Sequence, residues 1–242
     1  MNPRSLGERY IHIYGTDKVE GDTEIVLKNL FQAVDVKNFG ATFAEKGNNI
    51  SITGAVQIGQ GFNKYEDSRV EEQQILSPFR DGTKDTDNDG EGGKSKQSTL
   101  GTKIVSNEAH YVYPFVINPQ AYKEYEELGV TQGYTQEDYD KFKRTSMVAA
   151  TSYATNAKVG CENELAVFIE TKPDLYLPNL SEYVTFSKRD GKNQITLTFD
   201  TLLNELQDSI LSVEIYYNPY TTELIQNIQK AVLYNIFTQK EV

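Results

Sequence analysis

The sequence has few of the residues that build cross-links or metal cages. It contains one cysteine, two histidines and no tryptophan in 242 residues. A single cysteine excludes an intramolecular disulfide and a zinc site made of several cysteines. No apolar run approaches the roughly 20 residues of a membrane-spanning helix, and no apolar stretch of a signal peptide follows Met1–Ser5. We therefore expect a soluble, cytoplasmic protein.

Positive charge is also in short supply. The chain has 24 Lys and Arg against 35 Asp and Glu, a net charge of −11. Nucleic-acid-binding proteins usually present a basic face, so this balance argues against diffuse binding of nucleic acid by the whole surface. Even the most heavily charged region, residues 61–110, has seven basic and ten acidic residues, net −3. A local basic groove is still allowed, because net charge is only a sum.

What the chain does have is enough apolar and aromatic material for a core. Hydrophobic residues make up 38% of it, with 16 Tyr and 11 Phe, which is typical of a folded domain. Apolar periodicity, capping residues and turn signals predict the elements. The predicted strands cover residues 9–15, 39–44, 50–58, 109–118, 164–170, 184–186, 194–198 and 213–217. The predicted helices cover residues 22–34, 119–128, 135–155, 202–206 and 224–234.

Local signals support several of these elements. Asp22 or Thr23 is the expected N-cap of the first helix, whose inward residues are expected to be Ile25, Leu30 and Val34. The turn residues 46–49 and 188–191 each predict a hairpin, and residues 135–138 resemble a capping box. Pro114 indicates an edge position or a bulge in its strand. The order of elements favours an α+β fold with helices against a mainly antiparallel sheet, compatible with a ferredoxin-like or RNA-recognition-motif-like (RRM-like) core.

One long segment interrupts this core. Residues 61–103 are rich in glycine and charge, and residues 81–98 have almost no apolar side chains. A long loop without structure is uncommon in a compact domain and usually has a function. We expect residues 1–60 and 104–242 to form the core, and residues 61–103 to form a protruding β-hairpin with a disordered tip.

Catalytic and metal-binding patterns are weak. Residues 85–90 resemble the start of an EF-hand, but the twelfth position of that loop is Lys96 where calcium needs a bidentate Glu. His12 is expected on a strand and His110 at the start of another, and Cys161 has no partner for a nucleophilic pair. We expect no enzymatic activity, no cofactor and no metal.

Two segments have alternative interpretations. Residues 54–57 and 59–61 combine glycine, alanine and glutamine, which either let another backbone approach closely or simply end a strand in turns. The cations of the protruding segment belong either to a solvated loop or to an arm that touches phosphates. Phe62 and Phe79, apolar residues in this polar arm, could stack on bases or wedge between them.

The ordered set of short motifs resembles the CRISPR-associated Cas7 family, the backbone subunit of type I Cascade, and is closest to the type I-B branch. Residues 35–41 are similar to an Asp-x-Arg-x-Phe-Gly signature, and residues 52–57 to Ile-Thr-Gly-Pro-Val-Gln. The further matching segments are residues 98–101, 109–115 and 156–160. Lys37 stands where the signature has Arg, which keeps the charge but loses the bidentate fork, and Ala55 stands where it has Pro.

The resemblance implies an RRM-like palm with a thumb hairpin and a chain that is short at its N-terminal end. It implies copies that polymerise head to tail along CRISPR RNA (crRNA), display its bases for pairing with target DNA, and contact other Cascade subunits. Residues 62–103 would be the thumb, and residues 35–40 with 54–60 would face the RNA. The residues that it implies in RNA binding are Lys37, Asn38, Phe39, Gln57, Gln60, Phe62, Lys64, Arg69, Phe79, Arg80, Lys94, Lys96 and Lys103.

Two other functions are compatible with the sequence. One is a metal-dependent endoribonuclease like type III relatives of the family, with Asp35 as the nearest acidic candidate. The other is an acidic protein-interaction module that does not bind RNA.

Overall fold

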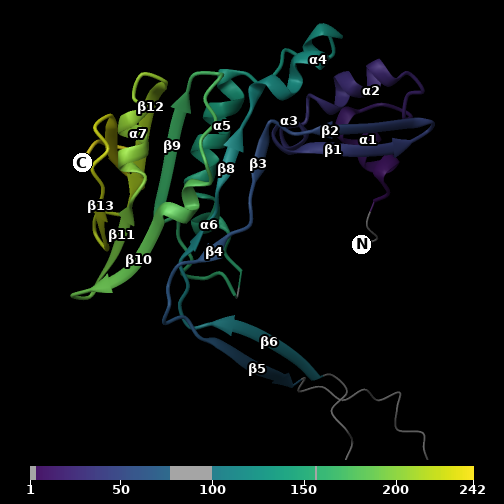
Figure 1. Cartoon of the computed structure of the whole chain (residues 1–242). Coiled ribbons are helices and arrows are strands. Elements are labelled where there is room, and N and C mark those ends of the chain that lie inside the picture. Colours follow the sequence, from purple (N-terminus) through teal and green to yellow (C-terminus); the bar gives the residue numbers. More distant parts are fainter. Residues whose placement is uncertain (1–3, 77–99, 156) are drawn as a thin grey trace, which may run out of the picture. The chain divides into compact units, whose positions relative to one another are not determined.

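The computed structural model describes residues 4–76, 100–155 and 157–242 (Figure 1). The chain divides into two compact units. The larger unit contains residues 1–61 and 113–242, and the smaller unit contains residues 62–112. The expected disordered tip, the EF-hand-like segment and the candidate residues Phe79, Arg80, Lys94 and Lys96 lie outside the described residues. So does Asn156, the first residue of the last family motif.

The larger unit begins with helix α1, Leu6–Tyr14, where the sequence predicted a strand over residues 9–15. That prediction was wrong because Tyr10 and Tyr14, which fit an alternating pattern, are also four residues apart and meet on one helix face with ring centroids 4.8 Å apart. A capping box starts the helix: the Glu8 N–H donates to Ser5 Oγ, and the Ser5 N–H donates to the Glu8 carboxylate. His12 therefore lies on an exposed helix face and not on a strand.

The next helix, α2 at Thr23–Leu30, confirms the prediction of its N-cap, because Asp22 Oδ1 accepts a hydrogen bond from the Glu24 N–H. Its buried residues are Val26, Leu27 and Leu30. The prediction that Ile25 and Val34 point inward was wrong. The helix ends at Leu30, and Val34 begins a separate short helix, α3 at Val34–Phe39, so one continuous helical face does not connect the two.

The predicted hairpin over residues 46–49 is confirmed: β1 (Gly40–Glu45) pairs antiparallel with β2 (Asn48–Thr53). Lys46 and Gly47 both have positive φ, the backbone that a tight hairpin turn needs. β3 (Val56–Ile58) then pairs antiparallel with β8 (Phe115–Ile117). Pro114 breaks the predicted strand of residues 109–118, since β7 (Tyr111–Val112) ends before it and β8 begins after it.

Helices follow β8, but each of the two helices predicted over residues 119–128 and 135–155 is divided into two shorter ones. They are the 3₁₀ helix η1 (Pro119–Tyr122) and the α-helices α4 (Lys123–Glu127), α5 (Gln136–Ser146) and α6 (Ala149–Ser152). The capping box of α5 is confirmed, with Thr135 as N-cap and Asp138 as its partner. The aromatic side chains of Phe31, Phe43, Tyr122 and Phe142 belong to one core cluster formed by the N-terminal elements and α5.

Two three-stranded sheets form the C-terminal part of this unit. One has the order β14-β12-β9, with β9 at Leu165–Thr171, β12 at Ile210–Tyr217 and β14 at Ala231–Asn235. The other has the order β10-β11-β13, with β10 at Val184–Arg189, β11 at Lys192–Leu197 and β13 at Thr222–Ile225. The 3₁₀ helix η2 (Leu180–Tyr183) and the helix α7 (Asp200–Glu205) complete this part.

The predicted helix over residues 224–234 was wrong, because this stretch contributes to two strands. β13 pairs parallel with β11, and β14 pairs parallel with β12. The apolar residues of this stretch follow a helical spacing, but each half of the stretch pairs with a strand that is distant in the sequence. The sheets therefore mix parallel and antiparallel pairs, and the α+β class predicted from sequence is confirmed at that level.

The smaller unit consists of two short antiparallel ladders. β4 (Phe62–Asn63) pairs with β7, and β5 (Val70–Leu76) pairs with β6 (Leu100–Ser106) over seven residue pairs. Val70, Ile75 and Ile104 on the longer ladder are exposed. No helix in the described part of the chain has the length and apolar character needed to cross a bilayer.

Candidate nucleic-acid interface

The two signature segments, residues 35–41 and 52–57, meet in the larger unit through two glycines. A Cβ atom on Gly54 would collide with backbone atoms of Asn38, Phe39 and Gly40. A Cβ atom on Gly40, whose φ is 77°, would collide with the carbonyl of Ile52. Glycine is therefore required at both positions, and of the two interpretations of residues 54–57 the close backbone approach is the one observed.

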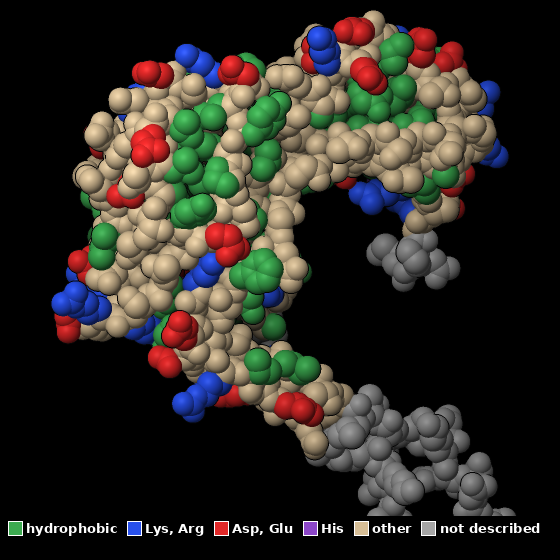
Figure 2. Space-filling view, viewed as in Figure 1, with side chains coloured by type: hydrophobic (Ala, Val, Ile, Leu, Met, Phe, Trp, Pro, Cys, Tyr) green, Lys and Arg blue, Asp and Glu red, His purple; other side chains and the backbone are tan. Residues whose placement is uncertain are grey.

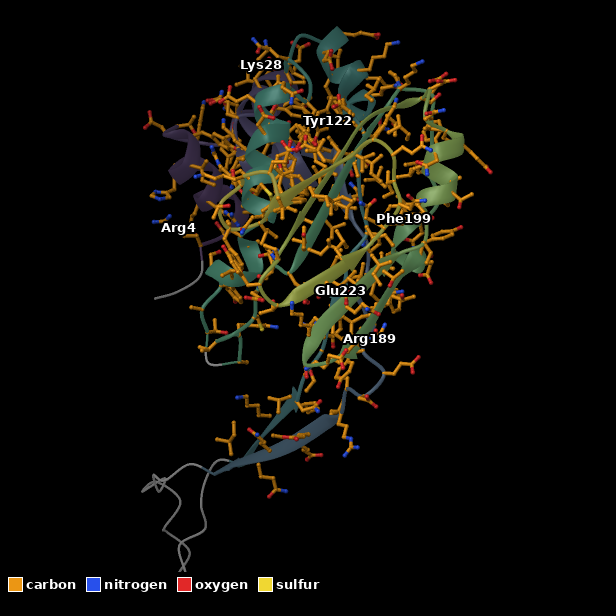
Figure 3. The ribbon with its side chains drawn as sticks, turned by 90° about the vertical axis from the view of Figure 1, so that its left-hand side faces the viewer. Arg4, Lys28, Tyr122, Arg189, Phe199 and Glu223 are labelled. Carbon is orange, nitrogen blue, oxygen red and sulfur yellow. The ribbon has the colours of Figure 1, made fainter. Side chains whose placement is uncertain are left out.

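A buried tyrosine hydroxyl joins these segments to η1. Tyr122 is 0% exposed and is labelled in Figure 3. Its hydroxyl donates to the Lys37 carbonyl over 2.9 Å and accepts from the Ala55 N–H over 3.1 Å. The Lys37 carbonyl lies in the last turn of α3. Carbonyl groups in the last turn of a helix have no hydrogen-bond partner within the helix. Burial raises the pKa of Tyr122, so the hydroxyl stays neutral and can both donate and accept.

We expect Tyr122→Phe to lower the free energy of unfolding by about 1–3 kcal/mol, because it leaves a buried N–H and a helix-end carbonyl without their partner. Urea denaturation measures this change. The matched control is Tyr125→Phe, since the Tyr125 hydroxyl makes a longer bond of 3.3 Å to the Ser51 carbonyl at the surface. Equal midpoints for the two variants would contradict the role given to Tyr122.

Asn38 is held entirely inside the larger unit. Its Nδ2 donates to the Val34 carbonyl over 2.7 Å, and its Oδ1 accepts from the Tyr134 hydroxyl over 2.8 Å. Burial raises the pKa of Tyr134, so the donor is retained. Although the resemblance implied that Asn38 contacts RNA, its amide is already occupied by α3 and by the loop before α5.

Lys37 also has an internal partner. Its Nζ lies 2.8 Å from Asp138 Oδ2, and the two side chains are only 18% and 12% exposed. Burial on its own would raise the pKa of Asp138, but the hydrogen bonds from Lys37 and Thr135 outweigh it and hold that pKa below its usual range. The charge of Lys37 is thus neutralised within the unit by Asp138.

Other side chains of the two segments face solvent. Phe39 is 52% exposed at the end of α3, directly before the interlocked glycines. Gln57 and Gln60 are exposed, and Gln57 is oriented by a 2.9 Å hydrogen bond from its Nε2 to the Gly54 carbonyl. An exposed ring and exposed amide groups on a rigid frame suit contacts with bases and sugars more than with phosphate charge.

Asp35, the candidate for metal-dependent cleavage, lies on the exposed side of α3. Its carboxylate is 3.7 Å from the guanidinium of Arg9, and both side chains are largely exposed. Within the described residues no three His, Cys, Asp or Glu side chains are grouped so that they could hold a metal ion. Cys161 is exposed and free of any disulfide.

In the smaller unit, Phe62 and Arg69 are exposed, and Lys64 and Lys103 are half-buried. Asn63 organises the base of this unit, because its Oδ1 accepts from the N–H groups of Tyr65 and His110. The imidazole of His110 lies 3.1 Å from Glu108 and edge-on to the ring of Tyr65. His110 therefore has structural contacts on two sides.

Sequence reasoning missed Tyr122, Tyr134 and Asp138 as parts of this site. Each lies more than 60 residues from its partner in the signature segments, so no local pattern reports that contact. The only available signal was the presence of tyrosines in segments otherwise rich in polar residues.

Comparison with known proteins gives one family. The family of CRISPR-associated protein Cas7 matches residues 7–203. Thirty chains of solved structures match the fold. One of them belongs to a structure titled "CRISPR RNA-guided surveillance complex, pre-nicking", with 16% sequence identity and a TM-score of 0.50. The match covers 84% of this chain and 52% of that chain, so this chain spans about half the length of the one that it resembles. No curated protein matches in sequence.

The family match includes both signature segments, the interlocked glycines, Tyr122 and the Lys37–Asp138 pair. It extends over 197 of the 242 residues (7 to 203). The chain belongs to the CRISPR-associated Cas7 family.

Proposed function

We propose that this chain is a crRNA-binding backbone subunit of a type I Cascade surveillance complex, closest to type I-B. Copies polymerise head to tail along the guide RNA in the cytoplasm and display its bases for pairing with target DNA, together with other Cascade subunits. The observation that carries the proposal is the family match across residues 7–203. The subunit itself is not an enzyme on this proposal.

The surface around α3 and β3 supports this function. Phe39, Gln57 and Gln60 project from a frame that is fixed by two glycines and by the Tyr122 hydroxyl. Aromatic stacking and amide hydrogen bonds do not depend on a basic surface. They therefore explain how a chain with a net charge of −11 can follow an RNA strand.

The two units correspond on this proposal to an RRM-like palm and a thumb. The β5–β6 ladder exposes Val70 and Ile104 on one face and Ile75 on the other. An isolated two-stranded ribbon is marginally stable in water. We infer that this ribbon gains its stability from RNA and from the next copy in the filament, in a heterologous contact.

Phe39→Ala tests the proposed RNA surface. We expect about a tenfold loss of affinity for crRNA with unchanged thermal stability, because stacking on an exposed ring contributes about 1–3 kcal/mol per base. Filter binding with the full complex measures the affinity. The control is Leu128→Ala, which removes a comparably exposed apolar side chain after α4. If the wild-type chain fails to bind guide RNA at low salt with all Cascade partners present, the proposed function is wrong.

A further inference from the structure

The turn between β10 and β11 concentrates positive charge in an acidic part of the chain. Residues 165–242 contain six Lys and Arg, and three of them, Lys188, Arg189 and Lys192, fall within five residues. Figure 2 shows Lys and Arg side chains gathered at the end of this hairpin beside acidic ones, and Figure 3 labels Arg189 at this end. The site considered above uses none of these residues.

Hairpin formation does not require these cations. Asp190 and Gly191 have φ of 51° and 79°, the backbone of a two-residue hairpin turn that Asp-Gly favours. The presence of Asp at position 190 is therefore accounted for by the geometry of the turn. Its carboxylate lies 3.9 Å from the Arg189 guanidinium, but this ion pair is weak because the side chains of Asp190 and Arg189 are 95% and 72% exposed. Arg189 and Lys192 are direct cross-strand partners, and like charges placed opposite each other destabilise a hairpin. An anionic ligand would relieve this repulsion.

An exposed tyrosine lies at the same end of β11 as the turn. β11 and β13 run parallel with Asn193 opposite Thr222, and the Asn193 N–H donates to the Thr221 carbonyl. Tyr220 lies in the turn just before β13, so it is at the same end of the parallel β11–β13 pair as the Asp190–Gly191 turn. Tyr220 is 70% exposed, although its N–H donates to Asn218 Oδ1 over 3.1 Å and its hydroxyl accepts from Asn235 Nδ2 over 3.3 Å. The hydroxyl end of the ring is thus held by Asn235, while most of the residue's surface faces water.

We propose that this hairpin tip, defined as Arg189, Lys192 and Tyr220, is a second contact for single-stranded nucleic acid. The two cations contact successive phosphates and the ring stacks on a base, the combination typical of sequence-tolerant binding to single strands. An acidic peptide would satisfy the cations but would leave the fixed ring without a stacking partner. The inference rests on the proposed function for the class of ligand, and it adds a surface outside the family's signature segments.

The test compares a charge variant with a matched control in the full complex. Arg189→Gln/Lys192→Gln removes the two cations of the tip. Lys123→Gln/Lys172→Gln removes two exposed cations elsewhere. Lys123 lies on α4. Lys172 follows the last residue of β9, at the end of that strand away from Leu165, the residue that pairs with Tyr217. Oligouridine and oligothymidine are the probes, so that RNA and DNA are distinguished as the source of the phosphates.

We expect the tip variant to reduce the slope of log K against log salt by about 1.4, at about 0.7 per phosphate of a single strand. If the tip variant and the wild type bind equally at about 1 M salt, this change in slope makes the variant bind about 25-fold more weakly at about 0.1 M salt. Tyr220→Ala should lose about tenfold, and Tyr220→Phe, which keeps the ring, should bind like the wild type. The control should keep the wild-type slope, and a loss confined to one probe identifies RNA or DNA as the ligand.

Three outcomes would overturn the inference. If the wild type binds and the tip variant keeps the slope of the control, the tip is not a contact, while the proposed function stands. If polyglutamate competes as well as either oligonucleotide and Tyr220→Ala has no effect, the tip binds acidic protein instead. If the wild type binds neither probe, with or without guide RNA, the inference and the proposed function fail together.

Discussion

Gly54→Ala is expected to destabilise the larger unit by about 3 kcal/mol, the upper range for overpacking a buried site. The added Cβ would meet backbone atoms of Asn38, Phe39 and Gly40, none of which can rotate away as a side chain could. Relief requires α3 to separate from the β2–β3 junction. That movement also breaks the bridge of the Tyr122 hydroxyl between the Lys37 carbonyl and the Ala55 N–H. Urea denaturation followed by circular dichroism measures the loss.

The control for this prediction is Gly21→Ala. A Cβ on Gly21 meets nothing within 4 Å, and its φ lies outside the range that side chains avoid. We expect its unfolding midpoint to remain at the wild-type value. If Gly54→Ala unfolds at the same midpoint, the two signature segments do not pack as described. Because Phe39 lies on the displaced side, guide-RNA binding by Gly54→Ala should fall together with stability.

Asp138→Ala is expected to have the second largest effect, a loss of about 2–3 kcal/mol. The substitution leaves Lys37 with a mostly buried charge and no partner, and removing one member of a buried pair costs more than the pair contributes. It also removes the acceptor of the Thr135 N–H at the start of α5. Asp140→Ala on the same helix is the control, since Asp140 is exposed and accepts only from Gln136 in the described contacts.

The effect of Asp138→Ala should depend on pH in a defined direction. The pKa of Asp138 is lowered in the folded chain from its ordinary value of 3.8, so the unfolded chain takes up a proton first as the pH falls. The stability from this carboxylate is therefore complete above about pH 4 and is lost as the pH falls through the lower, folded pKa. The difference between wild type and variant should shrink below that pH. A difference that is constant from pH 7 to the acid limit would contradict the ionic role.

Local signals in the sequence predicted a large part of the fold. The N-caps Asp22 and Thr135 and the turn at residues 46–49 each report on a few neighbouring residues, and the structure confirms them. Each depends on hydrogen bonds within three or four residues of the signal. For residues 54–57 the sequence left two interpretations open, and the structure selected the close backbone approach.

The two wrong elements failed for a related reason. Tyr10 and Tyr14 satisfy both a strand period and a helix period, so pattern alone does not choose between them. The residues of β13 and β14 follow a helical spacing, but strands β11 and β12, distant in sequence, pair with them. Pairing partners supply backbone hydrogen bonds that no local count of apolar residues includes.

The candidate site divides in the same way. The sequence by itself determined the acidic balance, the single cysteine and the family motifs, whose resemblance made Phe39 and Gln57 candidates for contact with RNA. Only the tertiary structure decided that Lys37 and Asn38 are held by Asp138 and Tyr134, and that Tyr220 lies at the same end of β11 as the Arg189–Lys192 turn. Charge and side-chain type are properties of a residue, and they can be read from its letter. Whether a charge is neutralised or a ring exposed depends on neighbours that folding brings together from distant parts of the chain.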